Sequence, residues 1–266
     1  MGVRTLPADA VDRAAAILET ARHEVRRIAS LPDDVRPRSL ADAYAIADRL
    51  AERLGWPLAG WYCGCTNVAL QRRLGLGEPV YGRLFAPLVH RSPAVLSQAT
   101  LTPVVLECEF GFRLSRDLPR RRAPYTHDEV REAIATVHPC IEVVAGHLED
   151  WIAAYAFDGV ADNAVDGGLV VGAGVPFDAD FDLRSVPVRL RIDGELARQG
   201  VGADVLGDPV VALTWLANAR SRDGDGLRAG DLHNTGTATD IAPFAAGSVA
   251  EADFGPVGKA KLTLTP

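Results

Sequence analysis

The chain has 266 residues, of which 48% are hydrophobic, 24% charged and only 6% aromatic, a composition typical of globular proteins. A formal net charge of −7 argues against a nucleic acid or an anionic membrane surface as the partner. The first residues lack the apolar core of a secretory signal, and no later run is long and apolar enough to span a bilayer. The four cysteines lack the spacing of a secreted disulfide framework, so we expect a cytoplasmic protein.

The first third of the sequence has helical periodicity. Residues 8–31 place apolar side chains at roughly helical spacing, and residues 36–57 contain a second helix with clearer ends. In this second helix we expect Ser39 to be the N-cap, with Asp42 three residues further on, and Gly55 to end the helix.

Beyond this helical part, the sequence changes to short β segments separated by glycine and proline. Two helices interrupt them: Thr126 and Glu129 form a capping box before residues 130–137, and a later helix begins after Asp208. The segments with strand character are residues 59–65, 104–114, 140–146, 167–174, 186–194 and 260–264.

Two glutamates lie in one of these segments, "VVLECEFGFRL", where a buried strand should be most apolar. Because alternate residues of a strand point to the same face, Glu107 and Glu109 project together. Their burial without a partner would cost several kcal/mol, so the pair needs solvent, arginine neighbours or a cation. A third acid, Glu142, lies in an equally apolar strand. An exposed strand face with arginine neighbours would need no ion, whereas three converging carboxylates would suit Mg²⁺ or Mn²⁺.

Several motifs follow one another in an order that points to a family. They are "SLADAYAIADRL", "GWYCGCTNVALQRRLGLGEPVYGRL", "LECEFGFRL", "CIEVV", "VADNAVDGGLVVG", "DPVVALTWLAN" and "GLRAGDLHNTGTAT". Together they resemble the 2-keto-4-pentenoate hydratase family of the fumarylacetoacetate hydrolase superfamily, which also contains 4-oxalocrotonate decarboxylases. The resemblance implies an α+β fold: a mixed β-roll or barrel forming a catalytic domain over residues 59–266, with a short helical region over residues 1–58.

The resemblance also implies a metal site. In this family an E-x-E strand and a later strand glutamate bind a divalent ion, and these roles fall on Glu107, Glu109 and Glu142. Mg²⁺ or Mn²⁺ is then expected to bind an enolisable 2-oxo or β-keto acid and to stabilise its enolate. Hydration, decarboxylation, ketonisation and C–C cleavage share this electron sink, so the site identifies a reaction class. The resemblance favours a homo-oligomer.

At four positions the sequence departs from the hydratases. Tyr62 stands where they typically have a lysine, and Val80 stands where they have an aspartate. Val165 replaces a serine, and His147 replaces an arginine that often follows the third metal ligand. The metal ligands are kept while polar groups near the substrate are lost. We therefore expect a larger or less polar substrate beside Val80 and Val165, with Tyr62 and His147 as acid–base candidates.

The motif "GDLHNTGTAT" is expected to line the pocket, as it does in the family. His233 lies either beside the substrate or against backbone only, while Thr235 and Thr237 are candidates to hydrogen-bond the substrate carboxylate. The four cysteines lack a zinc-binding pattern and are expected to be small buried side chains: Cys63, Cys65, Cys108 and Cys140.

The resemblance thus implies a divalent-metal-dependent lyase of hydratase or decarboxylase type, diverged from vinylpyruvate hydration and acting on a small oxo acid. One alternative is a decarboxylase, tautomerase or cyclising enzyme of a specialised biosynthetic pathway. Another is a relative that binds a small acid without catalysis, since three polar positions of the hydratases are replaced.

Overall fold

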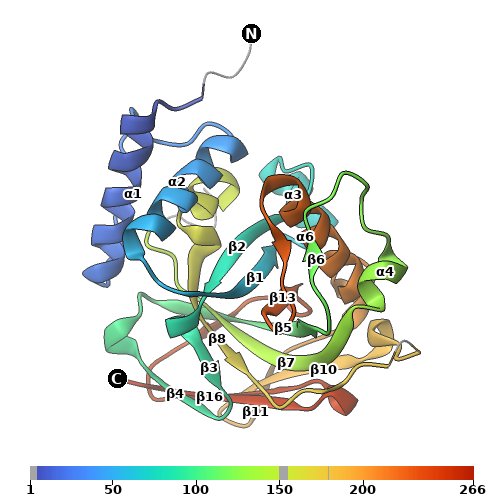
Figure 1. Cartoon of the computed structure of the whole chain (residues 1–266). Helices are drawn as coiled ribbons and strands as arrows, with labels where there is room; N and C mark the ends of the chain where they lie inside the picture. Colours follow the sequence, from blue (N-terminus) through green and yellow to red (C-terminus); the bar gives the residue numbers. More distant parts are fainter. Residues whose placement is uncertain (1–4, 150–154, 179) are drawn as a thin grey trace.

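The computed structural model describes residues 5–149, 155–178 and 180–266. Two N-terminal helices, α1 (Ala8–His23) and α2 (Leu40–Leu54), stand at one side of a strongly curled mixed sheet, and a second sheet lies beneath it in Figure 1. The predicted α+β class is confirmed. Among the described helices, none is long and apolar enough to cross a bilayer.

The ends of α2 follow from local chemistry. The Ser39 hydroxyl accepts a hydrogen bond from the backbone N–H of Asp42 at 3.1 Å, which satisfies one of the free donors of the first turn. Gly55 ends the helix in the left-handed conformation with φ of 61°. Both predicted caps are confirmed.

The first helix is shorter than predicted. Periodicity placed it over residues 8–31, but α1 ends at His23. Ile28 instead joins a short parallel bridge to Leu148, donating its N–H to the carbonyl of His147 at 2.8 Å. Pairing with a distant segment satisfies the backbone groups of Ile28, and local periodicity cannot predict such pairing.

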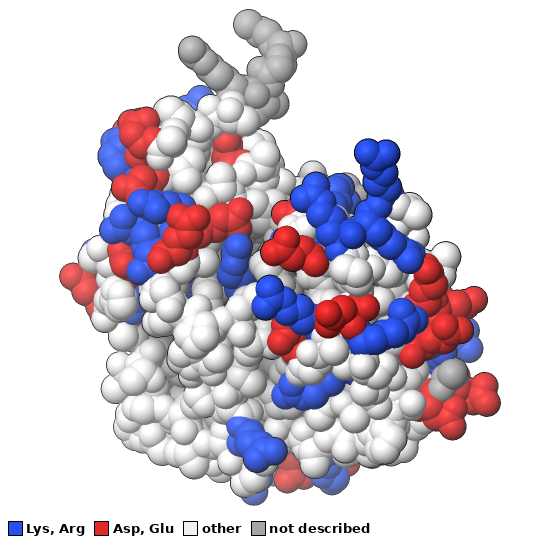
Figure 2. Space-filling model, in the orientation of Figure 1, with Lys and Arg blue, Asp and Glu red and all other residues white. Residues whose placement is uncertain are grey.

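Charged side chains join the two N-terminal helices at the surface. The Arg49 guanidinium lies 2.6 Å from Asp12, and that of Arg53 lies 2.8 Å from Glu19. Figure 2 shows acidic and basic side chains intermingled over this part of the molecule. Ion pairs at or near the surface contribute little to stability, so the apolar contacts beneath them hold the helices together, through residues such as Leu18, Ile46 and Leu50.

The main sheet carries both parallel and antiparallel pairs. Within the described residues it has nine strands, seven of them in the order β2-β1-β13-β5-β7-β8-β3. The β1–β13 and β3–β8 pairs are parallel, and the other pairs are antiparallel. The strands are β1 (Leu58–Gly64), β2 (Val80–Phe85), β3 (Val89–Arg91), β5 (Val104–Leu114), β7 (Ile134–Val144), β8 (Asp166–Val171) and β13 (Leu232–Thr237), with β14 (Ala242–Phe244) on β5 and β9 (Val175–Pro176) on β7.

The second sheet has the order β11-β10-β15-β16-β4. Its strands are β4 (Ala94–Ser97), β10 (Pro187–Ile192), β11 (Glu195–Val201), β15 (Val249–Asp253) and β16 (Lys259–Thr265). A small ribbon pairs β6 (Leu118–Pro119) with β12 (Gly226–Leu227). The other helical segments are α3 (Val68–Leu74), α4 (His127–Arg131), α6 (Pro209–Asp223), a π-helical segment (Tyr155–Gly159) and 3₁₀ turns (Ala86–Leu88, Gln98–Thr100, Asn163–Val165, Leu183–Ser185, Gly202–Asp204 and Gly255–Val257).

The helix predicted after Thr126 forms only in part. Thr126 and Glu129 make the expected capping box, but α4 ends at Arg131. The apolar residues that follow, from Ile134 onward, belong to β7. The prediction was wrong for "IATV" because a central position beside β5 rewards β-branched residues, whatever cap precedes them.

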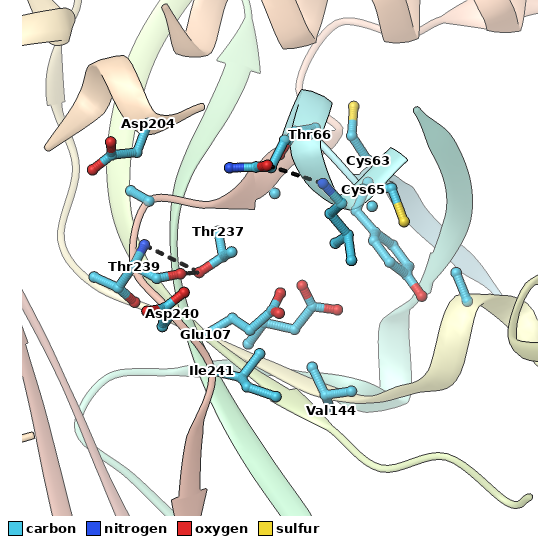
Figure 3. Close-up of a pocket in the computed structure, with 18 of the residues that line it drawn as sticks. Cys63, Cys65, Thr66, Glu107, Val144, Asp204, Thr237, Thr239, Asp240 and Ile241 are labelled. Carbon is cyan, nitrogen blue, oxygen red and sulfur yellow. Dashed lines mark hydrogen bonds between the residues drawn. The ribbon is translucent and has the colours of Figure 1, made fainter. Parts of the chain in front are cut away.

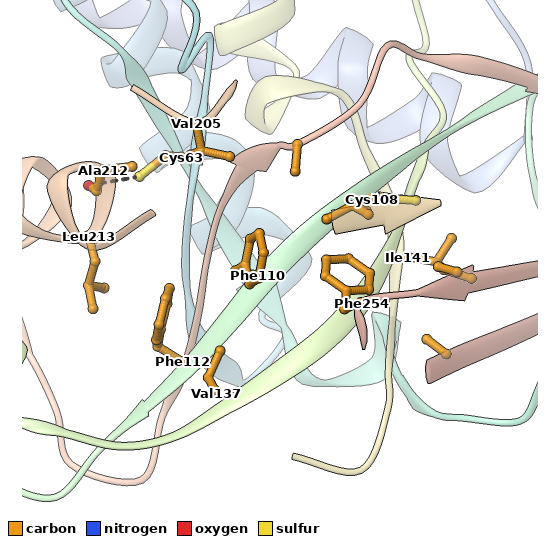
Figure 4. Close-up of a cluster of buried hydrophobic side chains, with 14 of the residues drawn as sticks. Cys63, Cys108, Phe110, Phe112, Val137, Ile141, Val205, Ala212, Leu213 and Phe254 are labelled. Atoms are coloured by element: carbon orange, nitrogen blue, oxygen red, sulfur yellow. Dashed lines mark hydrogen bonds between the residues drawn. The ribbon is translucent and has the colours of Figure 1, made fainter. Parts of the chain in front are cut away.

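The main core lies between the two sheets and between the curled sheet and α6. Figure 4 shows Phe110 and Phe112 of β5 with Phe254 and Leu213, and the Phe110 and Phe254 rings meet edge to face at 5.0 Å. Cys108 lies in this core, on the face of β5 away from Glu107 and Glu109. All four cysteines are buried, as predicted.

A buried ion cluster attaches the N-terminal helices to the sheet. Arg22 of α1 donates to Asp166 at 2.7 Å and to Asp162 at 3.2 Å, and none of the three side chains is more than 7% exposed. Asp162 also accepts from the backbone N–H of His147 at 2.8 Å and lies 3.0 Å from its ring Nδ1. Burial opposes ionisation of Asp162, but His147 and Arg22 outweigh it and lower its pKa.

Replacing Arg22 by methionine is expected to destabilise the fold strongly, because Asp162 and Asp166 would lose the cation they share. Removing one partner of a buried ion cluster costs about 3–5 kcal/mol. The urea midpoint of Arg22→Met, measured by circular dichroism, should therefore fall well below that of the wild type. The matched control is Arg49→Met, which removes two exposed pairs, with Asp12 and Glu52, and should shift the midpoint much less. Equal midpoints for the two variants would contradict the assignment.

Candidate metal centre

Two neighbouring strands carry the acidic side chains of the site. In the antiparallel β5–β7 pair, Glu107 lies directly opposite Glu142, and Glu109 follows two residues later on the same face. One oxygen from each of these three carboxylates lies within 4.8 Å of the other two. We call Glu107, Glu109 and Glu142 the carboxylate cluster. Like charges directly opposite one another destabilise a sheet, so the cluster needs a compensating interaction.

A bulge in the neighbouring strand β13 fixes one of these carboxylates. Asn234 pairs with Gly111 and Thr237 pairs with Glu109, so two residues of β13 face one residue of β5. The bulge includes Gly236 with φ of 81°, and a Cβ atom there would lie 2.0 Å from the Thr66 hydroxyl. Glu109 Oε2 accepts from the Asn234 amide and from the Gly236 N–H, the latter at 3.0 Å.

The electrostatics of the cluster favour a cation. Burial raises the pKa of Glu107, and the nearby Glu109 raises it further. Burial and the other two carboxylates likewise raise the pKa of Glu142 well above its usual value. Burial also raises the pKa of Glu109, although its hydrogen bonds oppose the shift. A divalent ion would offset this destabilisation of the charged forms.

The donor set fits such an ion. Glu109 Oε1 is buried and has no hydrogen-bond partner among the described residues, although a buried carboxylate oxygen normally has one. All three donors are carboxylate oxygens, which hard divalent cations prefer. Glu109 is fully buried and Glu107 partly exposed, so the cluster faces outward on one side.

The cluster opens into a cavity of about 590 Å³. Glu107 points into it in Figure 3, with Thr237, Thr239 and Asp240 on one side and Cys63 and Cys65 on the other. Its wall is partly apolar, through Leu70, Leu74, Val144, Val165 and Ile241. A pocket of this size with a few convergent polar groups is typical of a small-molecule site.

A left-handed turn forms another part of the wall. Three consecutive residues have positive φ: Asn163 at 49°, Ala164 at 52° and Val165 at 66°. This backbone is costly for a β-branched residue such as Val165, so the surroundings must hold it. The Tyr62 hydroxyl donates to the Asn163 carbonyl, and Asn163 accepts the N–H of Arg83 at 2.9 Å through its side chain.

Only some of the residues singled out in the sequence line the cavity. Tyr62, Val165 and Thr237 do, together with Glu107 and Glu142. The Tyr62 side chain is 2% exposed, and the Thr237 hydroxyl donates to the carbonyl of Thr239 at 2.6 Å.

Five of those residues are not part of the described lining: Val80, Glu109, His147, His233 and Thr235. Val80 is buried among apolar side chains, and His147 belongs to the Arg22 cluster. His233 accepts the Trp61 N–H at 3.3 Å, and burial lowers its pKa to about 4. The Thr235 hydroxyl donates to the Phe110 carbonyl at 3.2 Å.

Sequence reasoning did not single out Asn234, Gly236 or Arg73. The first two hold Glu109, and Arg73 lines the cavity. Asn234 and Gly236 stood within the quoted motif "HNTGTAT", where a glycine between polar residues is a signal for a bulge. Nothing in the spacing of "QRRLG" distinguishes Arg73 from Arg72.

Known proteins resemble the chain over most of its length. It is 34% identical over 253 residues to 2-keto-4-pentenoate hydratase from Paraburkholderia xenovorans, covering 94% of this chain and 93% of the relative. It is 32% identical to TodF product hydratase from Pseudomonas putida, covering 90% of each. A solved structure of 4-oxalocrotonate decarboxylase from Pseudomonas putida G7, complexed with magnesium and adipate, matches with a TM-score of 0.88 at 26% identity, over 98% of this chain and 100% of that one.

A family model agrees with these matches. The model for the fumarylacetoacetate hydrolase C-terminal region matches residues 80–265, which include the carboxylate cluster and both sheets apart from β1. The chain belongs to the fumarylacetoacetate hydrolase family.

Proposed function

We propose that the chain is a divalent-metal-dependent lyase of hydratase or decarboxylase type that acts on a 2-oxo acid. The observation that carries this proposal is the carboxylate cluster, three acids gathered within 4.8 Å at the inner end of a cavity. The similar proteins support the reaction class, since their names describe hydratases and a decarboxylase, one of them complexed with magnesium.

Glu107, Glu109 and Glu142 would hold Mg²⁺ or Mn²⁺. When bound, the ion supplies Lewis-acid chemistry by withdrawing electrons from a carbonyl group of the substrate. The hydrogen bonds from Asn234 and Gly236 keep Glu109 in place for this role. A cluster fixed in this way loses little conformational freedom on binding, which favours affinity.

Tyr62 is the acid–base group that we propose. It lines the cavity, whereas His147 is held by Asp162 outside the described lining. The only lysines in the sequence, Lys259 and Lys261, lie in β16 of the second sheet. The phenolic O–H donates to the Asn163 carbonyl, so the strained turn fixes the position of the phenolic oxygen. To act on the substrate, the hydroxyl would release this bond and turn its proton toward the cavity. Val165 and Val144 bring apolar surface to the same cavity, which fits a larger substrate with an apolar segment.

One observation favours a second candidate function. No lysine stands at position 62 and no aspartate at position 80, so a protein that binds a 2-oxo acid without turning it over also fits the site. Three other expectations stay predictions from composition and resemblance: a homo-oligomer, a cytoplasmic location, and a division into residues 1–58 and 59–266.

Neutralising one ligand is expected to abolish metal binding. Glu142→Gln keeps the size of the side chain but removes one of three charges, so Mn²⁺ affinity measured by calorimetry should fall at least about 100-fold. Asp240→Asn is the matched control, because Asp240 lines the same cavity outside the cluster. Circular dichroism checks that both variants are folded. Unchanged Mn²⁺ affinity in Glu142→Gln would refute the metal site.

Exchange of substrate hydrogen with solvent is expected to report the reaction class. With Mg²⁺ present, the protein should catalyse the incorporation of deuterium from D₂O at C3 of a 2-oxo acid. Proton NMR measures this exchange as the loss of the C3 signal. EDTA should stop the exchange, and added Mg²⁺ or Mn²⁺ should restore it. Evolved CO₂ or added water in the product then separates decarboxylation from hydration. Metal-dependent binding of many 2-oxo acids with no exchange or turnover would instead favour the non-catalytic function.

Removing the Tyr62 hydroxyl is expected to slow the reaction. In Tyr62→Phe the rate of deuterium exchange should fall at least about tenfold, while Mn²⁺ affinity stays near that of the wild type. The matched control is Tyr125→Phe. Tyr125 is also buried and its hydroxyl donates to the Pro119 carbonyl at 2.6 Å, but it is not among the described lining residues of the cavity. An exchange rate in Tyr62→Phe equal to that of the control would remove Tyr62 from the mechanism.

A further inference from the structure

One cationic side chain faces the cavity. Among the described residues that line it, Arg73 is the only lysine or arginine, and the other charged ones are acids: Glu107, Glu142, Asp204 and Asp240. Arg73 lies in the last turn of α3 and is exposed. Its guanidinium forms no ion pair with a described residue, whereas Arg83 and Arg220 are held by Asp48 and by aromatic rings. The charge of Arg73 is therefore free for a ligand.

The cavity has more room than a chelating 2-oxo acid head requires. Its volume of about 590 Å³ lies in the range of pockets that hold drug-sized ligands. Apolar side chains, including Leu70, Leu74 and Ile241, contribute to the wall. The carboxylate cluster is mostly buried and Arg73 is exposed, so the first marks the inner part of the cavity and the second its outer part. A ligand that fits both would have two anionic ends and an apolar middle.

The acids in the outer part of the cavity wall are poorer candidates for binding a cationic group of a ligand than Arg73 is for binding an anionic group. Asp204 already accepts the backbone N–H of Val201 at 2.9 Å, which caps a 3₁₀ turn. Asp240 is exposed, as Arg73 is, but it is one of four acids among the described lining residues, whereas Arg73 is the single cation there. An unpaired guanidinium at the mouth of an acid-lined cavity is better explained by an anionic group, since Arg binds carboxylates through two parallel hydrogen bonds.

We propose that Arg73 binds the second carboxylate of a dicarboxylic 2-oxo acid whose first carboxylate and keto group face the carboxylate cluster. Arg73 is then the residue that selects a diacid over a monoacid of the same chain length. This inference rests on the proposed function, because the inner end of the substrate is placed by the metal site.

The experiment compares matched pairs of ligands on the full-length protein saturated with Mg²⁺. Calorimetry measures the dissociation constants of 2-oxoglutarate, 2-oxoadipate and 2-oxopimelate and of the monoacids 2-oxopentanoate, 2-oxohexanoate and 2-oxoheptanoate. For at least one chain length the diacid should bind about tenfold more tightly or better, the size expected for one charge-assisted pair. Arg73→Gln should bring this ratio close to one.

Arg72→Gln is the matched control. Arg72 is the preceding residue of the same helix, is exposed, and does not belong to the described lining, so this variant should keep the diacid preference. A wild type without diacid preference at any length, or a preference that survives Arg73→Gln, would overturn the inference while leaving the metal site intact. Failure of every 2-oxo acid to bind in a Mg²⁺-dependent way would overturn the proposed function as well.

Discussion

The repulsion among three buried carboxylates is the constraint on which the site depends. Glu107 and Glu142 face each other across two central strands, where an apolar pair would be more stable, and Glu109 lies beside them with one oxygen unpaired among the described residues. A sheet that keeps such a cluster must compensate for it. The hydrogen bonds of Asn234 and Gly236 compensate in part, and a divalent ion would supply the remaining positive charge.

A second buried charge cluster stands next to the first and is neutralised differently. Arg22 reaches from the N-terminal helix α1 to Asp162 and Asp166, and Asp166 lies close enough to Glu142 to raise its pKa further. The turn at residues 163–165 is enclosed between these two aspartates and lines the cavity. The N-terminal helices thus help to shape the cavity without contributing a lining residue to the described part of it.

Local rules predicted much of this structure, and tertiary pairing explains the failures. Caps at Ser39 and Asp208 and the period-two pattern of β5 are strong local signals, and each element lies where they indicate. The bulge between Asn234 and Thr237 is different, because it depends on register with another strand. The bulge changes which side chains of β13 point toward the cavity. Thr237 therefore lines the cavity, whereas His233 and Thr235 form hydrogen bonds with backbone groups and lie outside the described lining. The register between two strands cannot be read from a single sequence.

The most direct test of the metal centre is anomalous diffraction from crystals of the protein grown with Mn²⁺. The account predicts one strong anomalous peak within coordination distance of oxygens from Glu107, Glu109 and Glu142, at the inner end of the cavity. A peak bound elsewhere, or three carboxylates that stay unliganded at saturating Mn²⁺, would contradict it.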